Sequence, residues 1–184
     1  MTPISFGIFA SANQSAAATS FESIATVTVG SGGASSADFT SIPGTYTHLQ
    51  VRFIAASSSA DMDIWARFNS DSGNNYALHR IYGDGSSVAA GAESSSNAID
   101  FFGRTGSGTS NFSANVADIL DYANTNKYKT ARVLYGRDSN GSGYMMFSSG
   151  LWMSYNAITS ISLFPQSGSF TQYSHFALYG IKSA

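Results

Sequence analysis

Hydrophobic and polar residues alternate along most of this chain, which is the pattern of β-strands with one buried face. Residues 46–56 show it clearly, because Leu49, Val51 and Phe53 fall on one face and Arg52 falls on the other. Similar segments predict nine or ten short strands, over residues 21–29, 46–56, 62–69, 76–83, 97–104, 114–123, 128–138, 144–156, 157–165 and 174–182.

Turn residues separate these strands at short intervals. The turn SDSGNN (70–75) predicts a hairpin between residues 62–69 and 76–83, and Asn140-Gly141 predicts a second hairpin. Residues 83–96 and 103–111 are rich in Ser, Gly and Ala and are predicted as loops. The connections are too short for the crossover helices of a parallel sheet. The pattern therefore predicts an all-β fold, an antiparallel β-sandwich that is jelly-roll-like.

The first twenty residues differ from the rest. Residues 1–20 have no charged side chain and no sustained period, but they include Ile4, Phe6, Ile8 and Phe9. This is too apolar for a free tail. We expect an N-terminal arm over residues 1–20, packed on its own domain or docked on another subunit or particle, followed by a single β-sandwich domain over residues 21–184.

Composition narrows the class of protein. Of the 184 residues only 11% are charged, and nine Lys and Arg face eleven Asp and Glu for a net charge of −2. A nucleic-acid binder normally has a basic surplus, so we expect no nucleic-acid partner. No apolar run approaches the length of a membrane helix, and no membrane association is expected. Because the chain has no cysteine, a disulfide framework and a thiolate metal site are excluded.

Candidate catalytic groups are sparse. His48, His79 and His175 each lie in a predicted strand among polar residues, and no G-x-S-x-G motif is present. The close carboxylate pairs are Asp61 with Asp63 and Asp118 with Asp121; the second pair points to opposite faces of a strand. We therefore predict no catalytic residues and no enzymatic activity.

Oxygen donors gather in one tight loop. Residues 69–75 contain Asn69, Asp71 and Asn75, a set that suits Ca²⁺ in principle. The loop lacks the ordered acidic spacing and the closing Glu of a calcium loop, so its residues are interpreted as turn formers. The glycine-rich segments 30–33 and 103–108 do not open helices and are interpreted as loops rather than phosphate sites. We predict no metal and no cofactor.

Aromatic residues are numerous for one sandwich, at 14% of the chain. Amphipathic rings among Ser and Gly suit core packing, protein interfaces or sugar stacking. The candidate interface residues are Ile4, Phe6, Ile8, Phe9, Trp65, Trp152, Tyr155 and Tyr173. In an alternative reading, Trp65 and Trp152 form a lectin-like platform for a glycan, with Asp71 and Asn75 on a metal.

Several segments resemble virion proteins of tailed bacteriophages. They are residues 25–53 (ATVTVGSGGASSADFTSIPGTYTHLQVRF), 66–87 (ARFNSDSGNNYALHRIYGDGSS), 121–130 (DYANTNKYKT), 157–170 (AITSISLFPQSGSF) and 174–182 (SHFALYGIK). The family consists of uncharacterised structural proteins described as tail, fibre or capsid-decoration proteins. The resemblance implies a virion β-module without enzymatic activity, and it leaves the N-terminal arm outside the match.

Together these observations lead to one expected role. We expect a non-enzymatic capsid decoration (cement) protein that binds the major capsid protein and stabilises the head. It would be located on the capsid surface of the virion after assembly in the host cytoplasm. The resemblance implies a homotrimer. The alternative is a tail or fibre receptor-binding module whose carbohydrate-binding jelly roll recognises a host glycan.

Overall fold

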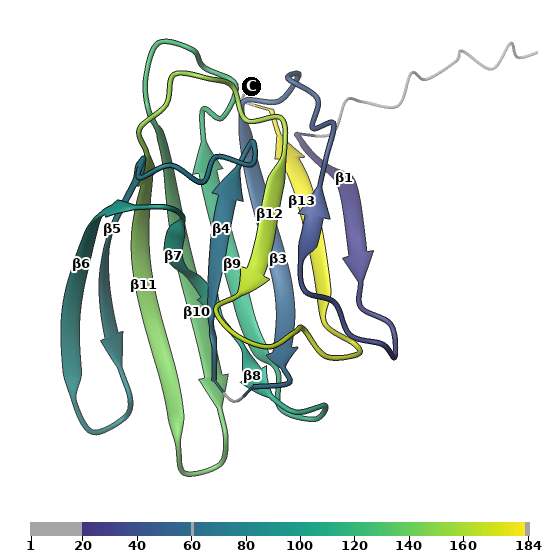
Figure 1. Ribbon diagram of the computed structural model, residues 1–184, viewed down its shortest axis with the longest axis vertical. Coiled ribbons are helices and arrows are strands. Elements are labelled where there is room, and N and C mark those ends of the chain that lie inside the picture. The colour runs from purple at the N-terminus through teal and green to yellow at the C-terminus, as the bar shows by residue number, and fades with distance from the viewer. Residues whose placement is uncertain (1–19, 60, 183–184) are drawn as a thin grey trace, which may run out of the picture.

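The computed structural model describes residues 20–59 and 61–182, which fold into strands joined by turns and loops (Figure 1). Within these residues no helix occurs, and hence none that is able to cross a membrane. The strands are β1 (Phe21–Thr28), β2 (Ala37–Phe39), β3 (His48–Ser57), β4 (Asp63–Phe68), β5 (Tyr76–Gly83), β6 (Val88–Ser96), β7 (Ile99–Arg104), β8 (Gly106–Ser107), β9 (Ser113–Leu120), β10 (Lys129–Asp138), β11 (Gly143–Trp152), β12 (Ile161–Pro165) and β13 (His175–Ile181).

Two sheets pack face to face, which confirms the predicted all-β sandwich. The larger sheet has the order β1-β13-β3-β9-β10-β11-β5-β6, and the smaller has the order β2-β12-β4-β7. All pairs in these paths are antiparallel; the two-residue β8 pairs with β3 in parallel. β6 lies at one side of the molecule and β1 at the other, and the small sheet covers the large one from the β1 side to β11 and leaves the β6 side outside it (Figure 1).

The core lies between the sheets, where the alternating side chains of each strand meet. Leu49, Val51 and Phe53 of β3 are buried on the inner face of the large sheet, as the alternation predicts. Phe68 of β4 packs from the small sheet and contacts Trp152 edge-on, with ring centroids 5.7 Å apart. Because a Cβ at Gly150 would lie 2.5 Å from Ile99, this glycine allows β7 to approach β11 closely.

The Asn140-Gly141 hairpin is confirmed, but the other predicted hairpin is wrong. β4 belongs to the small sheet and β5 to the large one. Asn69 and Ser70 both have positive φ, at 51° and 57°, and they turn the chain out of the small sheet. The Asn69 side chain holds this turn, since its amide bonds the Ala157 carbonyl and its oxygen accepts the Thr159 amide hydrogen.

Three strands lie in segments that were not predicted as strands. β6 occupies most of the predicted loop 83–96 and pairs with β5 through the register Ile81↔Ala90. Its small Ala, Gly and Ser residues have low strand propensity, so pairing rather than composition makes this segment a strand. β2 and β8 are only three and two residues long and carry too little pattern to be detected.

Candidate interaction surface

The outer face of the large sheet carries a row of exposed apolar side chains across five strands. Strand pairing places Val116 opposite Leu134, Leu134 opposite Phe147, Phe147 opposite Ile81, and Ile81 opposite Ala90. Residues paired in this way project from the same face of a sheet. The exposed fractions of Leu134, Phe147 and Ile81 are 55%, 48% and 51%.

A second row continues this apolar surface toward the hairpin tips. Met145 lies two residues from Phe147 on β11, and Val88 lies two residues from Ala90 on β6; their side chains are 66% and 74% exposed. Gly136 and Gly83 pair with Met145 and leave room between the side chains. A shallow hollow of about 300 Å³ opens there. We call these side chains the outer patch; they are Ile81, Val88, Val116, Leu134, Met145 and Phe147.

A polar row borders the outer patch on the same face. Gln50 donates a hydrogen bond of 2.7 Å to Asp118, and Arg132 pairs with Asp118 at 3.4 Å. Soluble monomers rarely expose a contiguous apolar surface, and a patch with a polar rim is typical of a protein interface. The outer patch is therefore the strongest candidate functional surface of the described residues.

Sequence reasoning missed the outer patch, although a signal was present. The inward phase of β10 includes Val133 and Tyr135, and Leu134 between them is apolar as well. β11 likewise has Met145, Met146 and Phe147 in succession. Three consecutive apolar residues in a strand indicate that both faces are covered, one by the core and one by something else.

Trp152 does not fit the predicted interface. It is 1% exposed and packs against Phe68 and Tyr76, and its indole N–H donates a 2.8 Å hydrogen bond to Asp71. The prediction that Trp152 lies at a surface, and could stack on a sugar, is wrong. Trp152 is the last residue of β11 and shares the inward phase of that strand, so it closes the core.

The other predicted interface residues do not meet at one place. Trp65 is partly buried on the small sheet, edge-on to Phe164 at 6.1 Å. Tyr155 and Tyr173 are 57% and 61% exposed, but Tyr155 follows β11 and Tyr173 precedes β13, at opposite ends of the large sheet. Four residues of the prediction lie outside the described residues: Ile4, Phe6, Ile8 and Phe9.

The Asp71 loop uses its oxygens internally. The Asp71 carboxylate accepts hydrogen bonds from the Trp152 indole, the Gly73 amide and the Asn75 side chain. Burial raises the pKa of Asp71, but these three hydrogen bonds outweigh it and hold the pKa below its ordinary value. The loop is thus built as a turn that anchors Trp152. Among residues 20–59 and 61–182, no three His, Asp or Glu side chains gather closely enough to hold a metal ion.

The acidic pair Asp61 and Asp63 lies at the start of β4, close to arginines of β10 and β7. Arg137 pairs with Asp61 at 2.9 Å, and Arg104 approaches Asp63 at 3.8 Å. Burial raises the pKa of Asp63 from an ordinary 3.8 to about 6, although Arg104 and Arg80 lower it in part. The Arg104 guanidinium also lies over the Tyr144 ring at 4.6 Å. Because each carboxylate has its own arginine from another strand, the arrangement ties β10 and β7 to β4.

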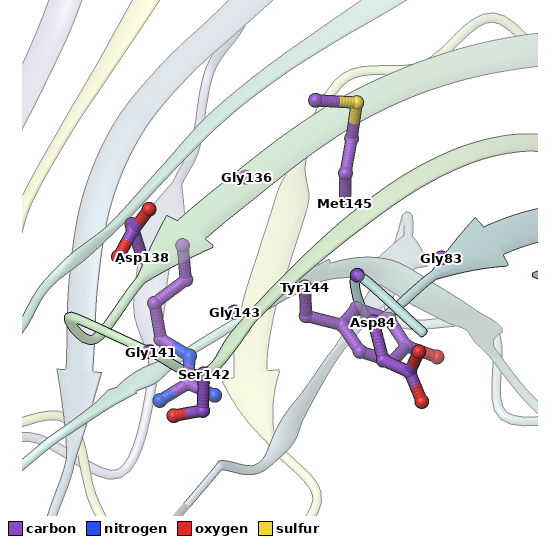
Figure 2. A pocket seen from close by; sticks show the side chains of 11 residues that line it. Gly83, Asp84, Gly136, Asp138, Gly141, Ser142, Gly143, Tyr144 and Met145 are labelled. Carbon is purple, nitrogen blue, oxygen red and sulfur yellow. The ribbon is translucent and has the colours of Figure 1, made fainter. Parts of the chain in front are cut away.

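A groove of about 610 Å³ separates the tips of the β5–β6 and β10–β11 hairpins (Figure 2). Figure 2 shows Asp84 beside Tyr144 on one side, and Asp138 on the other. Both carboxylates are engaged in their own turns, since Asp84 accepts the Ser86 amide hydrogen and Asp138 accepts that of Asn140. The groove is therefore a gap between two turns, five of its eleven lining residues are glycine, and its acidic groups help to hold the turns.

A search of protein-family models, curated proteins and solved structures finds no match to this chain.

Proposed function

We propose that this protein is a non-enzymatic structural subunit of a tailed-bacteriophage particle. The proposed role is that of a capsid decoration protein, which binds the major capsid protein at the surface of the head. The observation that carries the proposal is the outer patch, an uncharged surface of six apolar side chains on the large sheet. Such a surface serves protein–protein contact, and the sequence resemblance to phage virion proteins supplies the kind of assembly.

The strand order supports the jelly-roll part of the proposal. Strands β1, β13, β3 and β9 are neighbours in the large sheet, and β2, β12, β4 and β7 make up the small sheet. The chain thus alternates between the sheets in its first four strands and again near its end. Two four-stranded sheets filled in this way are typical of an eight-stranded jelly roll. In this interpretation β10, β11, β5 and β6 extend one sheet and create the outer patch.

The alternative is a tail or fibre module that recognises a host glycan. The burial of Trp152 removes one of the two rings proposed for sugar stacking, and Trp65 is only partly exposed. No single described site favours this alternative, so we rank it below the decoration role.

The proposal is tested by locating the protein on particles. Immunogold labelling of intact particles should mark the head, and particles that lack the protein should rebind it when it is added. Phe147→Ser should weaken rebinding at least tenfold if the outer patch contacts neighbours. Tyr155→Ser, a change of an equally exposed ring outside the outer patch, should leave rebinding unchanged. Labelling confined to the tail, or absence from particles, would refute the decoration role.

A further inference from the structure

The outer patch needs an apolar cover, and the chain contains a segment suited to this purpose. We propose that residues 4–9 of one copy dock on the outer patch of a second copy. Ile4, Phe6 and Ile8 alternate, so in an extended conformation they project from one side. This inference deepens the proposed function and rests on it only for the premise that the chain is an assembling subunit.

Residues 4–9 and the outer patch match in charge, because neither contains a charged side chain. No charged side chain precedes Glu22 in the sequence. The outer patch consists of Ile, Val, Leu, Met and Phe side chains, and its ion pair lies in the bordering row at Arg132 and Asp118. A partner with charged side chains would bury those charges at the outer patch without an opposite charge beside them, which is unfavourable. Residues 4–9 have no charged side chain and avoid this cost.

The dimensions of the two surfaces agree. An extended segment of six residues is about 20 Å long. The outer patch crosses from β9 to β6, which is four strand spacings, or about 19 Å. Residues 4–9 can therefore lie across the strands and contact the whole row from Val116 to Ala90.

The position at which the segment joins the domain favours a second copy. Ser20 lies at the β1 edge, where its carbonyl accepts a 2.9 Å hydrogen bond from the backbone amide of Lys182. Val116, the near end of the row, lies three strands away and about five residues further along, a distance of about 22 Å. Eleven residues from Phe9 to Ser20 span at most about 36–40 Å. Residues 4–9 of the same copy are therefore able to reach the row, but their path crosses the hydrogen-bonded polar side chains Gln50 and Arg52 of β3, which the segment of a neighbouring copy need not cross.

Disulfide trapping gives a direct test, because the chain has no cysteine of its own. Chains with Phe6→Cys are mixed with chains carrying Leu134→Cys and oxidised under mild conditions. We expect a disulfide between the two kinds of chain, which docking within one copy cannot produce. Tyr155→Cys replaces Leu134→Cys as the control and should form at least tenfold less product, since Tyr155 is equally exposed but outside the outer patch.

Two results would overturn the inference. Equal trapping by Leu134→Cys and Tyr155→Cys would show that the contact is not specific. A disulfide within single chains of a Phe6→Cys, Leu134→Cys double variant, with none between the mixed single variants, would show docking within one copy.

A second measurement addresses assembly in solution. Sedimentation should show that Phe6→Asp and Phe147→Asp each weaken self-association at least tenfold, while Tyr155→Asp does not. Phe6 precedes the thirteen strands of the described residues in the sequence, so its variant remains informative even if Phe147→Asp fails to fold. Self-association unaffected by Phe6→Asp would contradict the inference.

The two proposals fail separately. Trapping at Leu134 without binding to particles would retain the docking and reject the decoration role. Binding to particles without trapping would retain the role and reject residues 4–9 as the cover.

Discussion

At the scale of single residues, several polar groups near the start of β4 are buried at a cost in free energy. Asp63 lies among strands β4, β7 and β10, and the Oδ1 atoms of Asp61 and Asp63 and the Tyr135 hydroxyl are buried without a hydrogen-bond partner among the described residues. Burial favours the neutral form of a carboxyl group. These groups hold strands together through Arg137 and Arg104, at a cost in desolvation that depends on pH.

Asp63 should make the protein less stable as the pH rises. Its pKa is about 6 in the folded chain and near 3.8 when unfolded, so folding favours the protonated form. The stabilisation is complete below pH 4 and is lost as the pH passes 6, by at most about 3 kcal/mol. Asp63→Asn should remove most of this loss. Urea unfolding at pH 4, 5, 6 and 7 measures it.

Asp84→Asn is the control, because hydrogen bonds from the Ser86 and Ser87 amides lower the pKa of Asp84. Its contribution has the opposite sign and is lost as the pH falls. A pH dependence that is the same in Asp63→Asn and the unmodified protein would contradict the prediction.

Asp71→Ala should destabilise the fold by about 2 kcal/mol, because it leaves the buried Trp152 indole N–H without its acceptor. Thermal unfolding followed by tryptophan fluorescence reports both the loss and its location. Asn75→Ala removes a hydrogen bond to the same carboxylate without exposing a buried donor, and it should cost less than about 1 kcal/mol. Equal effects of the two changes would show that the indole bond is not the important one.

At the scale of elements, strands were more predictable than the partners of strands. Alternation locates β3, β4 and β9 closely because each has one buried face. The β4–β5 connection has the sequence of a hairpin turn, yet Asn69 bonds to distant backbone and directs the chain to the other sheet. β1 contains a bulge between Ser23 and Ala25, which places Phe21 on the outer face against Tyr179. Such features depend on residues far away in sequence, so no local pattern reveals them.

The β10–β11 hairpin depends on the backbone of its two central residues. Asn140 and Gly141 have φ values of 54° and 105°, and Ser139 bonds to Ser142 across the turn. Gly141→Ala should destabilise the protein by about 1–2 kcal/mol, because an L-residue disfavours this conformation. Gly30→Ala is the matched control, with open space around it and no positive φ. Chemical denaturation compares them, and an equal cost at both positions would contradict the role of the turn.

At the scale of the whole molecule, the sequence predicted the sandwich but not the surface that matters most. Single-strand patterns indicate which residues face the core, whereas the outer patch appears only when β9, β10, β11, β5 and β6 are placed side by side. The aromatic residues predicted to form an interface do not lie together in the fold, and Trp152 lies in the core. Neighbouring strands therefore had to be known before the candidate surface could be found.

Removal of residues 1–19 should leave the domain folded, because the core is formed by strands from β1 onward. The unfolding free energy of the dilute truncated protein should lie within about 1 kcal/mol of that of the full chain. Self-association and particle binding should both weaken, since the segment that covers the outer patch is missing. Urea unfolding and sedimentation measure the two effects. A truncated protein that is unfolded would show that residues 1–19 belong to the core.

The place of β13 has a consequence for synthesis on the ribosome. This strand lies between β1 and β3, so the large sheet cannot close until residue 181 has emerged from the exit tunnel. Unfinished chains are thereby unable to present a completed sheet to their neighbours. The strands of the outer patch are complete at residue 152, so the last part of the chain to be made joins β1 to β3 and leaves the patch itself unchanged.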